Sequence, residues 1–128
     1  MKIVFFGSGK FAVKILEAAH NSGHDISLIV TQPDRKKGRH LEVQGTPVKE
    51  YAREHNLMVF QPDKVNTPES LVILRKEKSD LCLVVSYGRI LCEEILTIPK
   101  IMCINIHASL LPKYRGAAPI AFALMKGE

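Results

Sequence analysis

Asn105 and His107 stand two residues apart at the end of a mostly apolar run that begins at Ile101. In a β-strand, residues i and i+2 point to the same side, so the amide and the imidazole are expected to share one face. An amide N–H can stabilise negative charge on an attacked carbonyl oxygen, and a nearby imidazole can transfer a proton. This pair therefore has the chemistry that acyl transfer requires, formyl transfer included.

The elements that must position this pair are short apolar strands alternating with helices. Strands are expected at residues 2–6, 26–30, 58–60, 81–85 and 101–106. Helices are expected from residue 11 to the stop at Gly23, and at residues 47–56, 67–78, 93–96 and 118–126, while residues 32–46 are expected to form a polar loop. This alternation predicts a Rossmann-like open parallel sheet with helices on both faces.

Ligands of such sheets bind at the carboxyl ends of the strands. Gly7, the segment 86–88 and the segment 105–107 all fall at such ends. The candidate catalytic pair therefore lies where the predicted fold would place a binding site.

Composition limits the classes of protein to which the chain can belong. Its 128 residues fit one domain with a real core. The net charge of +5 favours an acidic partner, such as nucleic acid or a polyanionic cofactor, or else reflects a mildly basic surface without one. The three cysteines, Cys82, Cys92 and Cys103, form no Cys-x-x-Cys motif, which fits a reducing compartment and argues against a zinc site. No apolar run approaches the length of a membrane span.

Residues 7–12 fit the pattern Gly-x-Gly-x-x-Ala between a strand and a helix, which makes a dinucleotide-binding protein the competing class. Such proteins place an acidic residue at the end of the second strand. Here that strand ends in Val30-Thr31-Gln32, and Asp34 comes late, inside the loop. The glycines also serve as a simple strand-to-helix turn, so dinucleotide binding ranks below acyl transfer.

The stretch 105–120 also contains Ser-Leu-Leu-Pro at 109–112 and Arg-Gly at 115–116. With Asn-x-His at 105–107, it resembles the signature of the folate-dependent formyltransferases. Further matching segments occur in the family's order: Phe6-Gly7, Phe11-Ala12, Thr31-Gln32-Pro33-Asp34-Arg35, Gly38-Arg39, Pro47-Val48-Lys49, Tyr87-Gly88, Ile90-Leu91 and Arg115-Gly116-Ala117-Ala118-Pro119-Ile120. The resemblance is strongest to the branch of the family that acts on methionyl-tRNA.

The resemblance implies transfer of a formyl group from 10-formyltetrahydrofolate to the free amino group of initiator methionyl-tRNA. Asn105 would donate a hydrogen bond to the tetrahedral oxyanion, and His107 would stabilise the same charge and assist proton movement. Folate contacts are expected from Ser109, Leu110, Leu111, Pro112, Tyr87, Gly88 and Ile90. Contacts with tRNA are expected from Arg35, Lys36, Lys37 and Arg39. A tight, partly buried turn remains the structural alternative for residues 109–112, and a solvated charged loop remains the alternative for the basic residues.

The resemblance covers all 128 residues but only the front part of the family's length. We therefore expect residues 1–128 to be the amino-terminal formyltransferase domain, ending before the family's catalytic aspartate and its C-terminal barrel domain. Such a piece is expected to bind folate weakly and to turn over little. We expect no metal, no membrane and no obligatory protein partner, in the bacterial cytoplasm or else an organellar matrix.

Three alternative functions stay open. One is another folate-dependent formyltransferase, with a purine precursor or a sugar nucleotide as substrate. A second is an NAD(P)-binding Rossmann protein. The third is a non-catalytic RNA- or anion-binding module that uses the basic loop, although this leaves the Asn-x-His pattern unexplained.

Overall fold

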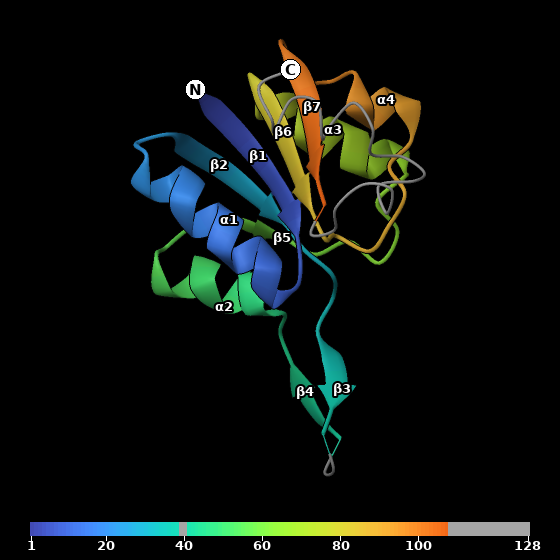
Figure 1. Cartoon of the computed structure of the whole chain (residues 1–128). Helices are drawn as coiled ribbons and strands as arrows, with labels where there is room; N and C mark the ends of the chain where they lie inside the picture. The colour runs from blue at the N-terminus through green and yellow to red at the C-terminus, as the bar shows by residue number, and fades with distance from the viewer. Residues whose placement is uncertain (39–40, 108–128) are drawn as a thin grey trace.

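Five parallel strands form the central sheet of the computed structural model, which describes residues 1–38 and 41–107 apart from the side chain of Lys37. The strands are β1 (Lys2–Gly7), β2 (Asp25–Val30), β5 (Val59–Phe60), β6 (Leu81–Val85) and β7 (Met102–Ile106). Their order across the sheet is β5-β2-β1-β6-β7 (Figure 1). The chain builds outward from β1 in both directions, so the junction between β1 and β6 is the topological switch point at which such sheets bind ligands.

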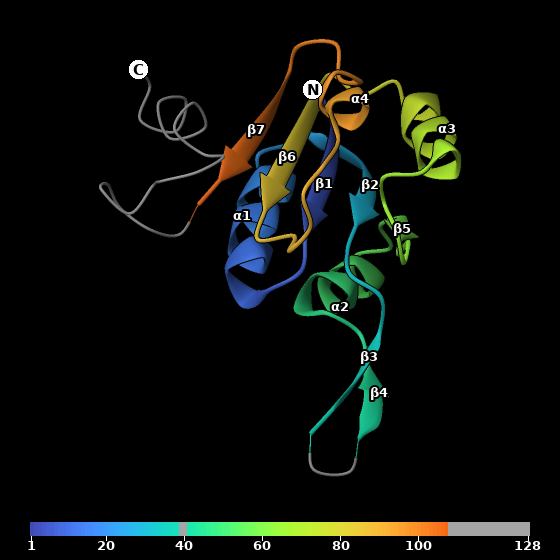
Figure 2. The ribbon, with the colours of Figure 1, turned by 90° about the vertical axis from the view of Figure 1, so that its right-hand side faces the viewer.

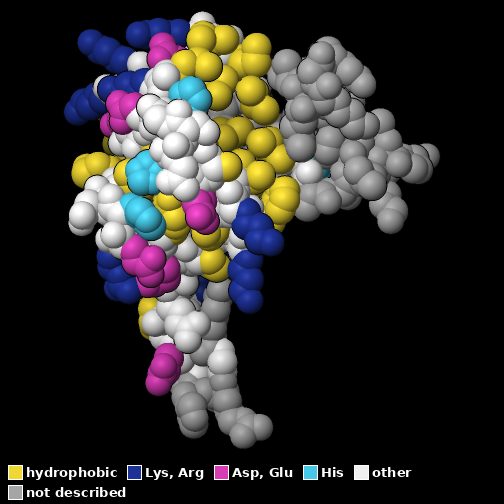
Figure 3. Space-filling model, turned by 60° about the vertical axis from the view of Figure 1, so that its left-hand side comes forward, with side chains coloured by type: hydrophobic (Ala, Val, Ile, Leu, Met, Phe, Trp, Pro, Cys, Tyr) yellow, Lys and Arg dark blue, Asp and Glu magenta, His cyan; other side chains and the backbone are white. Residues whose placement is uncertain are grey.

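Helices cover both faces of the sheet (Figures 1 and 2). One face carries α1 (Lys10–Asn21) and α2 (Pro47–Glu54), and the other carries α3 (Pro68–Lys76) and the short α4 (Glu93–Leu96). The prediction of a Rossmann-like open parallel sheet is therefore confirmed. On the side that carries α1 and α2, basic, acidic and histidine side chains are interspersed at the surface (Figure 3). Within the described residues, no helix is both long and apolar enough to cross a membrane.

Strand β1 shows why the core strands are continuously apolar. Phe5 and Phe6 are both 0% exposed, yet they point to opposite faces. Phe5 belongs to the cluster beneath α1 and α2, and Phe6 belongs to the cluster beneath α3 and α4. Because both faces of a central parallel strand are covered, Ile3 to Gly7 are all buried and no polar alternation remains.

Two helices begin as the sequence predicts, with a threonine cap followed by proline. The side chain of Thr46 accepts a hydrogen bond from the backbone N–H of Lys49 at 3.1 Å. The side chain of Thr67 accepts one from the backbone N–H of Ser70 at 3.2 Å. Each cap satisfies an amide that the first helical turn leaves unpaired, so both boundaries are set locally.

The expectation of an irregular polar loop at residues 32–46 was wrong in part. Strands β3 (Arg35–Lys37) and β4 (Glu42–Gln44) pair antiparallel and form a hairpin that projects from the body of the molecule (Figure 2). The described side chains of both strands are exposed, so no alternation of apolar and polar residues marks the strands, and the backbone ladder carries the pairing. The helix expected at residues 118–126 lies outside the described residues.

Candidate functional site

A cavity of about 350 Å³ opens at the carboxyl ends of β6 and β7. This volume falls within the range of small-molecule pockets, about 300–1,000 Å³. Its walls combine apolar side chains with an amide, a hydroxyl and an imidazole. The lining residues are Val84, Ser86, Tyr87, Gly88, Arg89, Ile90, Asn105, Ile106 and His107.

Asn105 and His107 both line this cavity and are both partly buried. Asn105 pairs in register with Val84 of β6. Ile106 packs against the cluster beneath α1 and α2, whereas Cys103 packs against the cluster beneath α3 and α4. Alternation along β7 therefore turns Asn105 toward the α3 and α4 face, and His107 follows immediately after the strand. The amide and the imidazole converge on one concave site.

Tyr87 contributes to the site mainly through its backbone. Its side chain is 3% exposed, and its ring meets the ring of Phe6 edge-on with centroids 5.6 Å apart. Burial raises the pKa of the phenol, so it stays protonated at neutral pH. The carbonyl of Tyr87 accepts hydrogen bonds from Gln32 Nε2 at 2.9 Å and from Ser8 Oγ at 3.3 Å. The aromatic ring thus fixes the loop to the core while the following residues face the cavity.

The loop after β6 turns sharply through two left-handed residues, Ser86 at φ +51° and Gly88 at φ +87°. A Cβ atom at Gly88 would come within 2.9 Å of Gln32 Nε2. The left-handed conformation therefore favours glycine at this position, and a side chain here would also displace the Gln32 amide from the Tyr87 carbonyl. Ile90, two residues later, is 89% exposed at the mouth of the cavity.

Asn66 holds the far side of the same loop, a role that the sequence analysis did not predict. Its Nδ2 donates to the carbonyl of Ile90 at 2.9 Å, and its Oδ1 accepts from the backbone N–H of Cys92 at 2.9 Å. The buried side chain of Leu91 lies between these two bonds in the sequence. The only sequence signal for Asn66 is its position just before the capped start of α3.

Gln32 is the second residue whose role the sequence did not reveal. Its side chain donates to the carbonyl of Tyr87 and accepts from Arg35 at 3.0 Å and from Arg89 Nε at 3.2 Å. Its backbone N–H donates to Ser8 Oγ at 3.2 Å. Gln32 thus joins the turn after β1, the loop after β6 and the base of the hairpin.

Replacing Gln32 with leucine is expected to loosen the loop at residues 86–90. The change removes three side-chain hydrogen bonds, each worth about 0.5–1.5 kcal/mol, while keeping a side chain of similar size. Hydrogen exchange read by mass spectrometry should show faster exchange in that loop. Gln61→Leu is the matched control, because Gln61 bonds to the carbonyl of Gln32 and to Asp34 but not to the loop. Unchanged exchange at residues 86–90 in Gln32→Leu would contradict the assigned role.

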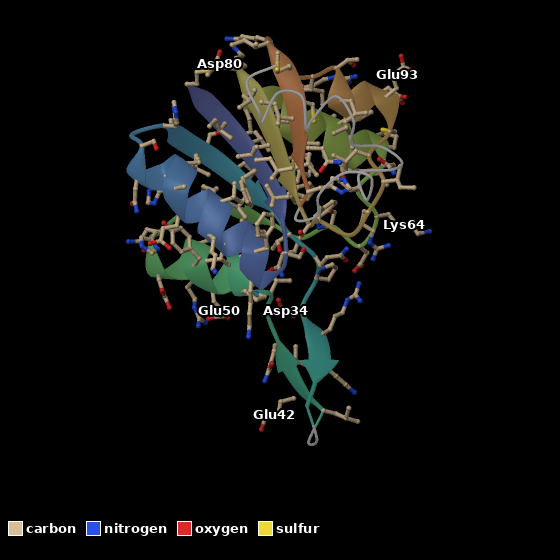
Figure 4. All side chains as sticks on the ribbon, viewed as in Figure 1. Asp34, Glu42, Glu50, Lys64, Asp80 and Glu93 are labelled. Carbon is tan, nitrogen blue, oxygen red and sulfur yellow. The ribbon has the colours of Figure 1, made fainter. Side chains whose placement is uncertain are left out.

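The base of the hairpin is held by an ion pair. The carboxylate of Asp34 accepts from Lys49 Nζ at 2.7 Å and from Gln61 Nε2 at 2.7 Å. These two hydrogen bonds hold the pKa of Asp34 below its ordinary value. Figure 4 shows Asp34 where the hairpin leaves the body of the molecule and Glu42 far out along it. The exposed Arg35 and Lys36 are therefore displayed on a ribbon that is anchored to α2.

A second cavity of about 680 Å³ lies between the hairpin base and the start of α1, and residues 86–89 line it together with the first cavity. Among the residues that the structure describes, three cations line it, Lys10, Arg35 and Arg89, and no carboxylate does. The two cavities therefore adjoin at the loop formed by residues 86–89. Asn105 and His107 line the first cavity, and the three cations line the second. The predicted residues Arg39, Ser109, Leu110, Leu111 and Pro112, and the side chain of Lys37, lie outside the described part of the chain.

Packing explains the glycine pattern after β1. A Cβ atom at Gly7 would lie 2.7 Å from the carbonyl oxygen of Val85 and 2.9 Å from Cβ of Ala12. The end of β2 carries the buried Thr31, whose hydroxyl lies 2.6 Å from that of Thr46. Asp34, the acidic residue that comes a few positions after the end of β2, already accepts hydrogen bonds from Lys49. Gly7 therefore permits the close contact of β1, β6 and α1, and no acidic residue occupies the position that a dinucleotide ribose would need.

Known proteins resemble this chain in sequence and in fold. The formyl transferase family model matches residues 1–128. The chain is 52% identical to the methionyl-tRNA formyltransferase of Sulfurihydrogenibium sp. (strain YO3AOP1) and 49% identical to that of Agathobacter rectalis. The whole chain aligns in both cases but spans only 42% and 41% of the length of these relatives. Phosphoribosylglycinamide formyltransferase from Bacillus halodurans shares the fold, with a TM-score of 0.67 at 21% identity over the whole chain and 66% of that structure.

Proposed function

Because this chain belongs to the formyl transferase family, we propose that its protein transfers a formyl group from 10-formyltetrahydrofolate to the free amino group of methionyl-tRNA. The observation that carries the proposal is the convergence of Asn105 and His107 on one cavity at the carboxyl end of β7. The curated relatives that match the whole chain at 52% and 49% identity favour the tRNA substrate. Those relatives are bacterial, which favours the bacterial cytoplasm as the site of action.

In this proposal the side chains of β7 act on the formyl carbon. The neutral amine of the acceptor attacks that carbon, and negative charge develops on the formyl oxygen. The amide of Asn105 donates a hydrogen bond to this oxygen, where a fixed donor is most effective. His107 stabilises the same charge and assists removal of the proton from the amine.

The first cavity is suited to the formyl donor. Val84 and Ile106 give it apolar walls, and the turn at Ser86 to Gly88 exposes backbone groups that can pair with a pterin ring. Ser109, Leu110, Leu111 and Pro112 complete the folate contacts in this proposal, as the family resemblance implies.

The hairpin and the second cavity are suited to the acceptor. The hairpin carries Arg35 and Lys36 in exposed positions, and the second cavity adds the cations Lys10 and Arg89. Phosphate groups of nucleic acid bind such cations with a strong dependence on salt. Lys37 and Arg39 extend the same strip of positive charge along the sequence. The net charge of +5 has the sign that a tRNA partner requires.

A thermal melt with two ligands tests the formyl donor. A ligand present at ~100 times its Kd stabilises the folded chain by about 2.7 kcal/mol. We expect a rise in Tm with saturating 10-formyltetrahydrofolate and no rise with NAD. Asn105→Ala is expected to keep most of the folate shift, since its role is in turnover. A rise with NAD alone, or no rise with either ligand from a chain that melts cooperatively, would contradict a folate site in this segment.

A further inference from the structure

We propose that Cys82 and Cys103 form a redox-sensitive thiol pair that hydrogen peroxide oxidises to an intrachain disulfide between β6 and β7, and that a dithiol reductant reopens. The proposed site lies beside the cavity but uses none of its lining residues. Chemically, the pair does not depend on the proposed formyl transfer.

The strand register places the two cysteines together. Cys82 and Cys103 are direct partners on adjacent parallel strands, and such strands lie about 4.8 Å apart. Disulfides usually join Cα atoms about 4.4–6.8 Å apart. Both side chains also pack on the same face of the sheet, in the cluster beneath α3 and α4. The pair therefore meets the main-chain condition for a disulfide without any change of fold.

The two thiols differ in their surroundings. Cys82 is 2% exposed, whereas Cys103 is only partly buried. The neighbouring Cys103 thiol raises the pKa of Cys82, as does burial, and the Cys82 thiol lowers the pKa of Cys103. A peroxide reaches the less buried sulfur first, so Cys103 is the attacking thiol and Cys82 the resolving one.

The chemistry balances with peroxide as the oxidant. The thiolate of Cys103 attacks one peroxide oxygen, an S–O bond forms, the O–O bond breaks, and water leaves after taking up the thiol proton. The sulfur of Cys82 then attacks the sulfenic sulfur of Cys103. The S–S bond forms, the S–O bond breaks, and the hydroxyl leaves as a second water with the proton of Cys82. Two thiols lose two electrons in total, and one peroxide becomes two waters.

The geometry also predicts that the bond is easily reduced. Side chains of register partners in parallel strands leave the sheet side by side, so their Cβ atoms stay near the strand spacing of about 4.8 Å. A relaxed disulfide prefers a Cβ separation of about 3.8 Å, and a strained bond is more readily reduced. This behaviour fits a reversible, transient disulfide in a reducing compartment rather than a structural one.

Formation of the disulfide would draw β7 toward β6 at a point just before Asn105 and His107 in the chain. Cys103 precedes Asn105 by two residues on the same strand and the same face. Under the proposed function, oxidation of the pair would therefore displace the oxyanion donor and lower formyl transfer.

Peptide mapping tests the site directly. Trypsin separates the three cysteines, because cleavage after Lys78, Arg89, Lys100 and Lys113 places them on peptides 79–89, 90–100 and 101–113. After one equivalent of peroxide, alkylation should modify one of the three thiols, and peptides 79–89 and 101–113 should be joined. Dithiothreitol should restore three alkylated thiols.

Three variants test whether the crosslink joins Cys82 and Cys103 specifically. Cys92→Ala should still form the crosslink, because Cys92 lies at the start of α4. Cys82→Val and Cys103→Val preserve apolar bulk in the strands and should form none. A crosslink that involves peptide 90–100, a disulfide between two chains, or three free thiols after peroxide would overturn the proposal.

A formyl-transfer assay of the whole protein then tests separately whether the disulfide displaces Asn105. Peroxide should lower formyl transfer reversibly in the native sequence and leave Cys82→Val active. An equal loss of activity in the native sequence and in Cys82→Val would contradict the proposed effect on Asn105, but it would not contradict the disulfide found by peptide mapping. An enzyme that lacks formyl transfer even when reduced would refute the proposed function alone.

Discussion

Replacing Asn105 with alanine is expected to lower kcat for formyl transfer by about 10²–10³-fold, equivalent to roughly 2.7–4 kcal/mol of barrier. The amide lines the cavity at the ends of β6 and β7, and in the proposed mechanism it donates to an oxygen whose charge appears only as the amine attacks. An interaction that forms mainly in the transition state affects kcat and leaves the KM for the folate nearly unchanged.

A chimaera allows this to be measured, since the chain spans 42% of the length of its Sulfurihydrogenibium relative. The matching segment of that relative would be replaced by residues 1–128, and the variant made in the chimaera. Asn21→Ala is the matched control, because Asn21 is exposed at the end of α1. Near-normal kcat in Asn105→Ala, or a loss confined to KM, would contradict the assigned role.

Replacing Phe6 with alanine is expected to destabilise the chain by about 3–5 kcal/mol, because removing a buried aromatic ring leaves a cavity that the core cannot fully close. Phe6 is 0% exposed, and its ring supports Tyr87 at the edge of the site. Urea unfolding followed by circular dichroism measures the loss, and Tm should fall by roughly 10–20 °C.

Phe5→Ala is the control that separates a general loss of stability from an effect on the candidate site. Phe5 is equally buried but faces α1 and α2, so its replacement should cost a similar amount. Only Phe6→Ala should also weaken the folate shift, measured below the Tm of both variants. Val72→Ala, at a side chain 51% exposed on α3, should change stability by less than about 0.5 kcal/mol. Equal effects of Phe5→Ala and Phe6→Ala on folate binding would contradict the support of Tyr87 by Phe6.

The sheet could be predicted because its signals are local and strong. Strands such as β6 are apolar runs of the length of a buried strand, and Thr46-Pro47 and Thr67-Pro68 mark helix starts chemically. The position of Asn105 and His107 at a shared cavity follows from alternation and from the end of β7. Their catalytic roles, like the folate and tRNA contacts, stay predictions.

The hairpin was not predicted because the described side chains of both of its strands are exposed. The described side chains of the two strands, Arg35, Lys36 and Glu42–Gln44, are all exposed, and the pattern of apolar residues records burial rather than backbone pairing. A two-stranded ribbon with two polar faces therefore looks like a loop in the sequence.

The roles of Gln32 and Asn66 were not predicted, for a different reason. Each acts through hydrogen bonds to partners far away in the chain, such as Tyr87, 55 residues from Gln32, and Ile90, 24 residues from Asn66. Their importance comes from the meeting of the ends of β1, β2 and β6, which only the folded sheet brings about. Side chains that position a loop carry no spacing pattern of their own.

The most direct test of the central claim is a formylation assay of the chimaera with two acceptors, methionyl-tRNA and glycinamide ribonucleotide, and 10-formyltetrahydrofolate as donor. We expect formyl-methionyl-tRNA as the product, formed at a rate close to that of the unmodified Sulfurihydrogenibium relative, and no formylated glycinamide ribonucleotide. A folded chimaera that formylates only the ribonucleotide, or neither acceptor, would contradict the proposed transfer of a formyl group to methionyl-tRNA.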